Sequence, residues 1–229
     1  MSAPLSVIVP TLDAAARIGP CLGALGEGLM AGLVRELVIA DGGSSDAIAE
    51  VTEAVGGRLI TAPRGRGPQL AAGCQAAAGR WLLVAHADTR LPPGWAETVA
   101  RHIAEHPDKA GYFGLRFDAT GFAAGWVAGW ANLRSALFAL PYGDQALLVP
   151  ADLYRAVGGY PEIAIMEDVA LVRRIGRRRL RRLAGYALTS AERYQRDGWV
   201  RRGARNLTTL ALWHLGADPD RLAERYRRR

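Results

Sequence analysis

The sequence is poor in cysteine and lysine and has no long uninterrupted apolar segment. Its two cysteines, Cys21 and Cys74, lie far apart in the sequence and lack the spacing of metal ligands. So few cysteines argue against a disulfide scaffold and for a reducing compartment. No apolar stretch of about eighteen residues is free of charge, so a membrane span is not expected. The first residues, MSAPLSVIVP, contain no basic segment before an apolar one, so we expect no secretory signal and a cytoplasmic location.

Half of the 229 residues are hydrophobic, which is enough to bury a sizeable core and excludes global disorder. There is no internal repeat and no low-complexity linker, so the chain is expected to form one unit.

The basic residues are unevenly distributed, and all but Lys109 are arginine. Residues 1–172 contain 12 basic and 17 acidic side chains, whereas residues 173–229 contain 17 basic and 5 acidic ones. A basic C-terminal quarter fits an anionic surface, either a membrane or a nucleic acid. A solvated basic face explains the same composition, and both interpretations stay open.

Strand and helix patterns alternate through the first half of the chain. Short apolar runs predict strands at Leu5–Val9, Glu36–Ala40, Arg58–Thr61 and Trp81–Ala85. Helical patterns lie between them at Ala14–Leu25, 47–55 and Pro68–Ala78. Further strands are expected at Ala110–Phe117 and Ala146–Val149, and helices at 167–175 and 198–215. The alternation predicts an α/β fold with a mostly parallel central sheet flanked by helices.

Charged side chains follow the predicted strands where each strand ends. The first strand leads into Pro10-Thr11-Leu12-Asp13, the second ends at Asp41, and the fourth leads to Asp88. The third is followed by an Arg-Gly loop. Because ligands of such sheets bind at the carboxyl ends of the strands, this convergence predicts an active site there.

The loop Arg64-Gly65-Arg66-Gly67-Pro68 has three features that favour phosphate: two guanidinium groups, glycines that allow close backbone approach, and a following helix N-terminus. It lacks the Gly-Lys-Ser/Thr ending of a Walker loop. A flexible exposed loop is the alternative interpretation.

Two acidic motifs suggest chemistry. In His86-Ala87-Asp88, a carboxylate at a strand end can hold a divalent cation that neutralises a diphosphate; a helix cap is the alternative. Glu167 and Asp168 can supply a general base, or they can be partners of a helix dipole.

Several other polar residues have simpler interpretations. Asp41 can accept hydrogen bonds from a base or ribose, whereas Asp46 is expected to cap the following helix. Arg193 can reach a phosphate and Tyr194 can stack on a ligand, but the start of a surface helix explains both residues as well.

The chain resembles the inverting family 2 glycosyltransferases, which have the GT-A fold. The resemblance covers roughly residues 5–170 and is carried by VIVPTLD, IADGGSSD, RGRGPQLAAGCQAAAGRWLLVAHADT and MEDVAL. The His-Ala-Asp-Thr motif and the Tyr-Gly-Asp-Gln turn are similar to those of a small subgroup called arsenosugar-biosynthesis-type glycosyltransferases. The resemblance implies metal-assisted transfer of a sugar, with inversion, from a nucleotide-diphosphate sugar to an acceptor hydroxyl.

The resemblance also implies residue roles. For the donor these are Pro10, Thr11 and Asp13 around the nucleotide, Asp41 at the base, Arg64, Arg66 and Gly67 at the base and diphosphate, and Arg193 at a phosphate. For the divalent cation, Mg²⁺ or Mn²⁺, they are Asp88 and also His86, which replaces the first acid of the usual Asp-x-Asp. For the reaction they are Asp168 as base, Glu167 beside it, and Gln145 near the acceptor or donor sugar.

The implied domain spans residues 1–195, with a nucleotide-binding half at about 1–90 and an acceptor half at about 91–195. A C-terminal helix and basic tail follow over 196–229. The processive synthases' Gln-x-x-Arg-Trp appears only as Ser190-x-x-Arg193-Tyr194, which argues against a processive polysaccharide synthase.

Other functions predict different features. A sugar-1-phosphate nucleotidyltransferase would carry a Gly-rich basic loop after the first strand, where this chain has Pro-Thr-Leu-Asp. A non-catalytic protein that binds nucleic acid or a membrane surface through the basic tail would not need the strand-end acids. We expect no nucleic-acid partner.

The apolar segment 121–140 contains Trp126 and Trp130. A core or lid helix is the preferred interpretation, because tryptophan is mostly buried. Tryptophan together with the arginines of the tail also suits a membrane interface, so a lipid-linked acceptor and peripheral contact at the inner membrane face stay open.

Overall fold

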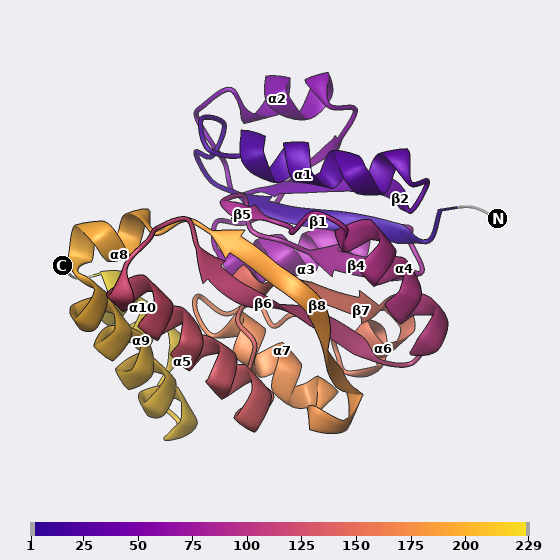
Figure 1. Ribbon diagram of the computed structural model, residues 1–229. Coiled ribbons are helices and arrows are strands. Elements are labelled where there is room, and N and C mark those ends of the chain that lie inside the picture. The colour runs from indigo at the N-terminus through magenta and orange to yellow at the C-terminus, as the bar shows by residue number, and fades with distance from the viewer. Residues whose placement is uncertain (1–2, 228–229) are drawn as a thin grey trace.

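The computed structural model describes residues 3–227 and shows one sheet with helices on both faces (Figure 1). The strands are β1 (Leu5–Thr11), β2 (Val34–Asp41), β3 (Arg58–Thr61), β4 (Trp81–Val84), β5 (Thr89–Arg90), β6 (Ala110–Phe117), β7 (Leu147–Pro150) and β8 (Leu180–Thr189). The helices are α1 (Gly19–Met30), α2 (Ile48–Ala54), α3 (Arg66–Ala76), α4 (Trp95–Glu105), α5 (Phe122–Phe138), α6 (Ala151–Ala156), α7 (Glu167–Ile175), α8 (Glu192–Asp197), α9 (Trp199–His214) and α10 (Pro219–Arg227). Two short 3₁₀ turns are η1 (Gly143–Gln145) and η2 (Arg177–Arg179).

The strand order is β3-β2-β1-β4-β7-β6-β8-β5. The first four strands along the chain are parallel, as are β6 and β8. The antiparallel neighbours are β4 with β7, β6 with β7, and β5 with β8. The predicted α/β fold with a mostly parallel sheet is therefore confirmed.

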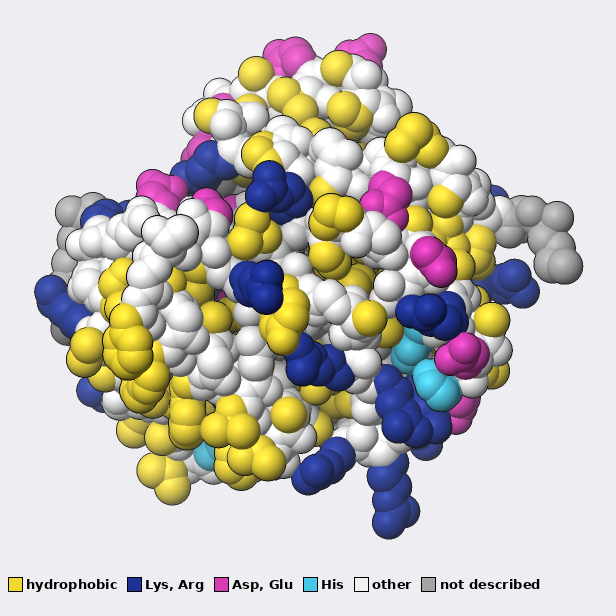
Figure 2. Space-filling model, viewed as in Figure 1, with side chains coloured by type: hydrophobic (Ala, Val, Ile, Leu, Met, Phe, Trp, Pro, Cys, Tyr) yellow, Lys and Arg dark blue, Asp and Glu magenta, His cyan; other side chains and the backbone are white. Residues whose placement is uncertain are grey.

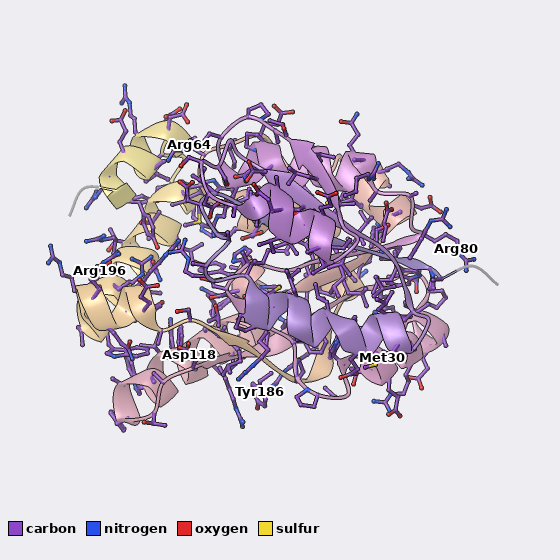
Figure 3. All side chains as sticks on the ribbon, turned by 90° about the horizontal axis from the view of Figure 1, so that it is seen from above. Met30, Arg64, Arg80, Asp118, Tyr186 and Arg196 are labelled. Atoms are coloured by element: carbon purple, nitrogen blue, oxygen red, sulfur yellow. The ribbon has the colours of Figure 1, made fainter. Side chains whose placement is uncertain are left out.

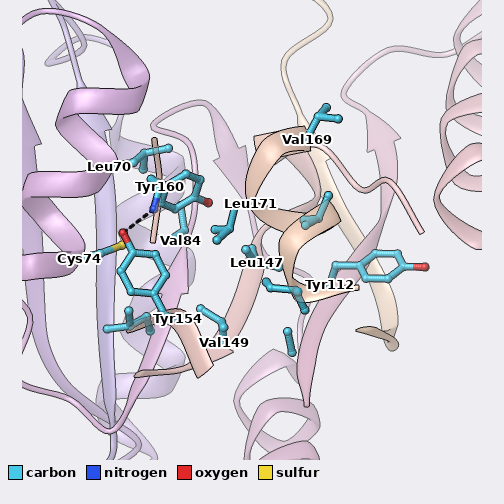
Figure 4. Close-up of a cluster of buried hydrophobic side chains, with 14 of the residues drawn as sticks. Leu70, Cys74, Val84, Tyr112, Leu147, Val149, Tyr154, Tyr160, Val169 and Leu171 are labelled. Atoms are coloured by element: carbon cyan, nitrogen blue, oxygen red, sulfur yellow. Dashed lines mark hydrogen bonds between the residues drawn. The ribbon is translucent and has the colours of Figure 1, made fainter. Parts of the chain in front are cut away.

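Alternation along β1 builds two cores. Val7 and Val9 face a cluster that includes Trp95 of α4, whereas Ile8 faces the opposite cluster with Leu70 of α3. Figure 4 shows part of the second cluster, where α3 and α7 pack on the sheet. Burial on both faces explains why the strand is apolar throughout.

Two elements differ from the sequence-based expectations for physical reasons. The first helix begins at Gly19 instead of Ala14, because Pro20 has no amide hydrogen and fits only the first helical turn. Strand β8 was not predicted. Its register with β6 shifts between Tyr112 and Gly114, and Gly185 has φ of +92°, so its buried positions do not alternate.

The segment expected to be a basic tail contains helix α10, whose Leu222 and Ala223 are buried against the rest of the chain. The core interpretation of Trp126 and Trp130 is wrong: both lie on the exposed side of α5. Within residues 3–227, no helix combines the length and the apolarity needed to cross a bilayer.

The spacing between α3 and the sheet is set by Gly73. A Cβ at this position would lie 2.6 Å from Ile8 Cγ2 and 3.2 Å from Ala40 Cβ. We expect Gly73→Ala to lower the free energy of unfolding by about 1–3 kcal/mol through overpacking. Gly23→Ala in α1, where a Cβ meets nothing within 4 Å, should raise it by about 0.5–1 kcal/mol. Urea denaturation measures both variants, and equal stabilities would contradict the close packing.

Candidate active site

Two adjoining cavities lie at the carboxyl ends of β1 and β4. The larger has a volume of about 740 Å³ and the smaller about 130 Å³. The larger is within the range of small-molecule sites, roughly 300–1,000 Å³. We call the boundary between them the junction; the residues that line both cavities include Arg66, His86, Asp88, Arg193 and Tyr226.

The structure brings most of the sequence-predicted site residues to these cavities. Pro10, Thr11 and Arg64 line the larger cavity, and Asp168 lines the smaller one. In the view from above, Arg64 lies beside the C-terminal helices (Figure 3). Residues from the first strand, two loops and α7 thus surround one continuous space.

Asp41 is buried next to this space and does not line it. Its Oδ1 accepts a hydrogen bond from Thr11 Oγ1 at 2.9 Å, and its Oδ2 accepts bonds from the amides of Gly43 (2.9 Å) and Ser44 (2.8 Å). Burial acts to raise the pKa of Asp41, but the hydrogen bonds from Ser44, Thr11 and Gly43 together lower it. The carboxylate organises the loop after β2.

Asp13 and Asp46 also hold loops. Asp13 Oδ1 accepts a bond from the amide of Ser45 at 2.9 Å. Asp46 Oδ2 accepts one from the amide of Ala15 at 2.7 Å, and α2 has no side-chain cap, so the predicted capping role of Asp46 is wrong. The loop after β1 is thereby tied to the loop after β2.

Gly67 and Gln145 lie behind the cavity walls. A Cβ on Gly67 would strike the backbone of residues 161–163, so glycine permits close approach of that segment. Gln145 is fully buried, accepts a bond from Ser135 Oγ at 2.7 Å and donates one to the carbonyl of Phe113 at 3.1 Å. These contacts fix the η1 turn.

The neighbouring Asp144 lines the smaller cavity and was missed by the sequence analysis, which singled out Gln145 in the same turn. Burial raises the pKa of Asp144 to about 6, although Arg134 opposes the shift. Arg134 itself is buried with its guanidinium 3.4 Å from the centre of the Tyr142 ring. The turn motif was the available signal, but only the fold shows which residue faces the cavity.

Glu167 and Arg66 form an ion pair across the site, with Nε 2.9 Å from Oε1. Glu167 is fully buried, whereas the Arg66 side chain is 45% exposed and reaches the junction. Burial raises the pKa of Glu167 to about 7, Arg66 opposes this shift, and Asp168 adds to it. The sequence analysis assigned Arg66 to a phosphate; the structure shows that it also neutralises a buried carboxylate.

Asp168 lines the smaller cavity and has one carboxylate oxygen without a hydrogen-bond partner among the described residues. Its Oδ2 accepts a bond from the amide of Gly143 at 3.0 Å, while Oδ1 is buried and has no hydrogen-bond partner among the described residues. Gly143 lies between Asp168 and His86, where a Cβ would collide with both side chains. A carboxylate held at one oxygen and free at the other is suited to accept a proton from a bound hydroxyl.

His86 is a neutral imidazole at physiological pH. Burial and the nearby Arg66 lower its pKa to about 4, and its Nε2 has no hydrogen-bond partner among residues 3–227. Neutral imidazole can ligate a metal ion. His86 therefore presents an unused ligand atom beside Asp88 at the junction.

These two side chains fit a cation that is shared with a substrate. No group of three or more histidine, cysteine, aspartate or glutamate side chains in the described part of the chain is placed to hold a metal ion by itself. Mg²⁺ is usually bound by one or two carboxylates together with substrate phosphates and water. Asp88 supplies one carboxylate of that pattern and His86 an imidazole, so these side chains would hold a cation only together with substrate phosphates and water.

The C-terminal helices close the smaller cavity, which the sequence analysis did not foresee. Arg202 Nη2 donates to Tyr226 Oη at 2.9 Å, Tyr226 Oη donates to Asn206 Oδ1 at 2.8 Å, and Asn206 Nδ2 donates to Tyr194 Oη at 2.8 Å. All four line that cavity. The sequence analysis singled out Tyr194 alone among them; no motif marks Arg202, Asn206 and Tyr226, because their spacing has meaning only after α9 and α10 pack together.

The fold is similar to that of solved glycosyltransferases. The S. aureus TarS 1–349 structure in complex with UDP-GlcNAc has a TM-score of 0.63 and 16% identity, covering 82% of this chain and 58% of that chain. Glucosyl-3-phosphoglycerate synthase from Mycobacterium tuberculosis, in complex with Mn²⁺, UDP and glucosyl-3-phosphoglycerate, has a TM-score of 0.62 and 17% identity, covering 82% and 72%. The chain therefore has the GT-A fold.

Sequence comparison is more specific. Residues 6–138 match Glycosyl transferase family 2. The PGL/p-HBAD biosynthesis glycosyltransferase of Mycobacterium bovis is 32% identical over 172 residues, and a Mycobacterium tuberculosis protein of the same name matches equally. Each match covers 70% of this chain and 64% of the relative, so the chain spans slightly less than two thirds of these relatives' length. The chain belongs to glycosyl transferase family 2.

The ion pair between Arg66 and Glu167 predicts a pH-dependent loss of stability. Arg66→Met leaves Glu167 buried without its cation. This should lower the free energy of unfolding by about 2–3 kcal/mol at pH 8, less than for a fully buried pair because Arg66 is partly exposed. The raised pKa of Glu167 means that the folded state binds more protons than the unfolded state between its ordinary pKa and about 7, so stability falls as pH rises. The loss in Arg66→Met should therefore be smaller at pH 5.

Urea denaturation at both pH values measures this difference. Adding Glu167→Gln to Arg66→Met should restore most of the stability at pH 8. Arg155→Met, which removes an exposed ion pair with Asp152, is the matched control and should change little. A loss of equal size at both pH values would contradict the assignment.

Proposed function

We propose that this chain transfers a sugar from a nucleotide-diphosphate sugar to an acceptor hydroxyl, with inversion at the anomeric carbon. The observation that carries the proposal is the junction: Arg66, Arg193 and Asp88 border both cavities, and Asp168, whose Oδ1 has no hydrogen-bond partner among the described residues, lines the smaller one. The solved neighbours with UDP-GlcNAc, or with UDP and Mn²⁺, support the same class of donor.

The larger cavity would hold the nucleotide. Pro10, Thr11 and Arg64 line it, and Asp13 and Asp41 shape it through the loops that they hold. The diphosphate would lie at the junction between the guanidinium groups of Arg66 and Arg193, which supply charge-assisted hydrogen bonds. Arg193, near the start of α8, lines both cavities, which supports this role.

Asp88 and His86 would hold the divalent cation together with the diphosphate. When bound, Mg²⁺ or Mn²⁺ supplies positive charge that offsets the charge of the leaving diphosphate. The protein's own contribution is to keep His86 neutral and Nε2 unpaired, so that both side chains are available as ligands.

The reaction is a single displacement. The acceptor oxygen bonds to the anomeric carbon, the bond from that carbon to the diphosphate oxygen breaks, and Asp168 accepts the acceptor's proton. The amide of Gly143 keeps the Asp168 carboxylate in place. Glu167 acts indirectly, because it fixes Arg66 next to the leaving group.

A sugar-1-phosphate nucleotidyltransferase is not favoured, because the loop after β1 is neither Gly-rich nor basic. Membership of the arsenosugar-biosynthesis-type subgroup is a proposal that rests on the His-Ala-Asp-Thr motif and the Tyr-Gly-Asp-Gln turn, and no substrate comes with it. The domain boundary at residue 195, the cytoplasmic location and a lipid-linked acceptor stay predictions.

Asp168→Asn tests the general base. The amide cannot accept the proton, so turnover should fall by at least about a hundredfold, within the usual 10²–10⁴ contribution of general-base help. Affinity for UDP, measured by calorimetry, should not change. Asp152→Asn, an exposed aspartate, is the control. Near wild-type turnover in purified Asp168→Asn would remove Asp168 from the mechanism.

Asp88→Ala tests the cation site through binding alone. Wild-type affinity for UDP should rise on addition of Mn²⁺ and fall again with EDTA. In Asp88→Ala the Mn²⁺-dependent gain should drop by at least the roughly 10–100-fold that loss of an outer-shell metal partner costs. Asp108→Ala, an exposed residue after α4, should behave as wild type. Wild-type affinity that is identical with and without Mn²⁺ would exclude the site.

A further inference from the structure

Helix α5 has large apolar side chains outside and polar side chains inside. The exposed large side chains are Phe122 (87%), Trp126 (64%), Trp130 (42%), Leu133 (48%), Leu137 (51%) and Phe138 (63%). The other exposed positions of the helix are glycine and alanine, so its outer side has no polar group. We call this side the apolar face.

The inner side of α5 explains why the helix cannot turn to bury these rings. Asn132 accepts a bond from the amide of Leu115 at 2.8 Å and donates one to its carbonyl at 3.0 Å, which pairs the helix with β6. Ser135 donates to Gln145 in the η1 turn. Arg134, the charged residue of the helix, is buried over Tyr142. Rotation would break all these contacts, so the apolar face is exposed in the folded chain.

Figure 2 shows hydrophobic side chains gathered over α5 on the surface of the molecule. Soluble monomeric proteins rarely expose large contiguous apolar patches, and such patches usually mark a contact with a partner or a membrane. Exposed aromatic and leucine side chains of this kind are those that interfacial helices bury in a bilayer, and in α5 the polar side packs against the protein.

A cluster of arginines adjoins the end of this face. The segment 173–182 contains seven exposed arginines: Arg173, Arg174, Arg177, Arg178, Arg179, Arg181 and Arg182. None of them forms an ion pair with a carboxylate of residues 3–227, and no acidic residue lies between Asp168 and Glu192 in the sequence. Arg177 Nη1 donates to the carbonyl of Leu137 at 3.0 Å, which joins this arginine cluster to the C-terminal end of α5.

We propose that the apolar face and the arginine cluster dock this chain on an anionic lipid bilayer, with α5 lying in the plane of the interface. Aromatic rings at the headgroup level and arginines beside anionic headgroups satisfy both features at once. An isologous dimer through α5 would cover the apolar face but supply no acids to the arginine cluster. Nucleic acid would use the arginines but leave the apolar face in water.

The surface also adjoins the candidate active site. The inner side of α5 packs through Ala124, Ala128 and Ala131 in a cluster with Phe117 and Tyr194, which line the smaller cavity. A docked bilayer would lie against the helix that backs this cavity. The docking proposal rests on the surface alone and stands or falls independently of the transferase proposal.

Co-sedimentation of the full chain with vesicles tests the proposal. We expect binding to vesicles of phosphatidylcholine mixed with phosphatidylglycerol, and weak binding to phosphatidylcholine alone. Binding should weaken from about 0.01 M to about 1 M salt, as the Debye length falls from about 30 Å to 3 Å. Wild-type chain that fails to bind the anionic vesicles in low salt would overturn the proposal.

Two pairs of variants separate the two features. Trp126→Ser with Trp130→Ser should lower the partition coefficient by at least about tenfold, because two exposed rings lose their burial in lipid. Leu29→Ser with Met30→Ser, equally exposed on α1, is the matched control and should bind as wild type. Unchanged binding in the tryptophan variant would overturn the proposal.

Arg178→Glu with Arg179→Glu should lower the partition coefficient on anionic vesicles by at least about fivefold for each arginine replaced. Arg35→Glu, at the start of β2 and far from β8 in the strand order, should have little effect; Arg178→Glu alone, which changes the net charge equally, should weaken binding about fivefold, and equal binding of these two single variants would contradict the role of the arginine cluster.

Brominated lipids give a second readout. They should quench tryptophan fluorescence in wild type, and Trp126→Ser with Trp130→Ser should remove most of that quenching. Sedimentation velocity without lipid tests whether a second copy of the chain occupies the apolar face instead. If the wild type is a dimer and the tryptophan variant is a monomer, the apolar face is a contact between copies and the lipid proposal is overturned. Quenching by brominated lipids that persists in the tryptophan variant overturns the proposal as well.

Discussion

The ion pair between Arg66 and Glu167 joins the two sides of the candidate site. Arg66 begins α3, next to the larger cavity, and Glu167 begins α7, whose next residue is Asp168. Because Glu167 is fully buried, α7 cannot move away from α3 without leaving a carboxylate unpaired in the interior. The distance between the cationic junction and the free oxygen of Asp168 is therefore fixed by one electrostatic contact.

The acids at the strand ends divide into two groups. The first group is Asp13, Asp41 and Asp46, whose oxygens accept hydrogen bonds from amides and hydroxyls of the loops after β1 and β2. Asp88 and Asp168 keep oxygens directed at the cavities. The first group makes the walls of the nucleotide side rigid, and only the second group is available for ligands and protons. A position in the loops at this edge of the sheet does not by itself tell the acids that hold loops from the acids that line the cavities.

The first half of the chain could be predicted from the sequence because its strands are short apolar runs and its helices lie between them. The failures have local causes. A bulge and Gly185 break the alternation of β8, and Pro20 shifts the start of α1. The contribution of α10 to the site could not be predicted from the sequence, because Tyr226 contacts Asn206 only through tertiary packing. Trp126 was misjudged because the general tendency of tryptophan to be buried does not say which side of an apolar helix faces the core.

Helix α5 links its exposed apolar face to Asp168, the proposed base, through a continuous chain of contacts. Ser135 on its inner side donates to Gln145, Gln145 holds the η1 turn, and the amide of Gly143 in that turn binds Asp168. The inner side of the helix is thus dictated by the geometry of the site. Nothing in that geometry requires large apolar residues on the outer side, where alanine or lysine would fold equally well. The exposed rings are therefore not explained by the packing of the fold, and docking on a bilayer would account for them.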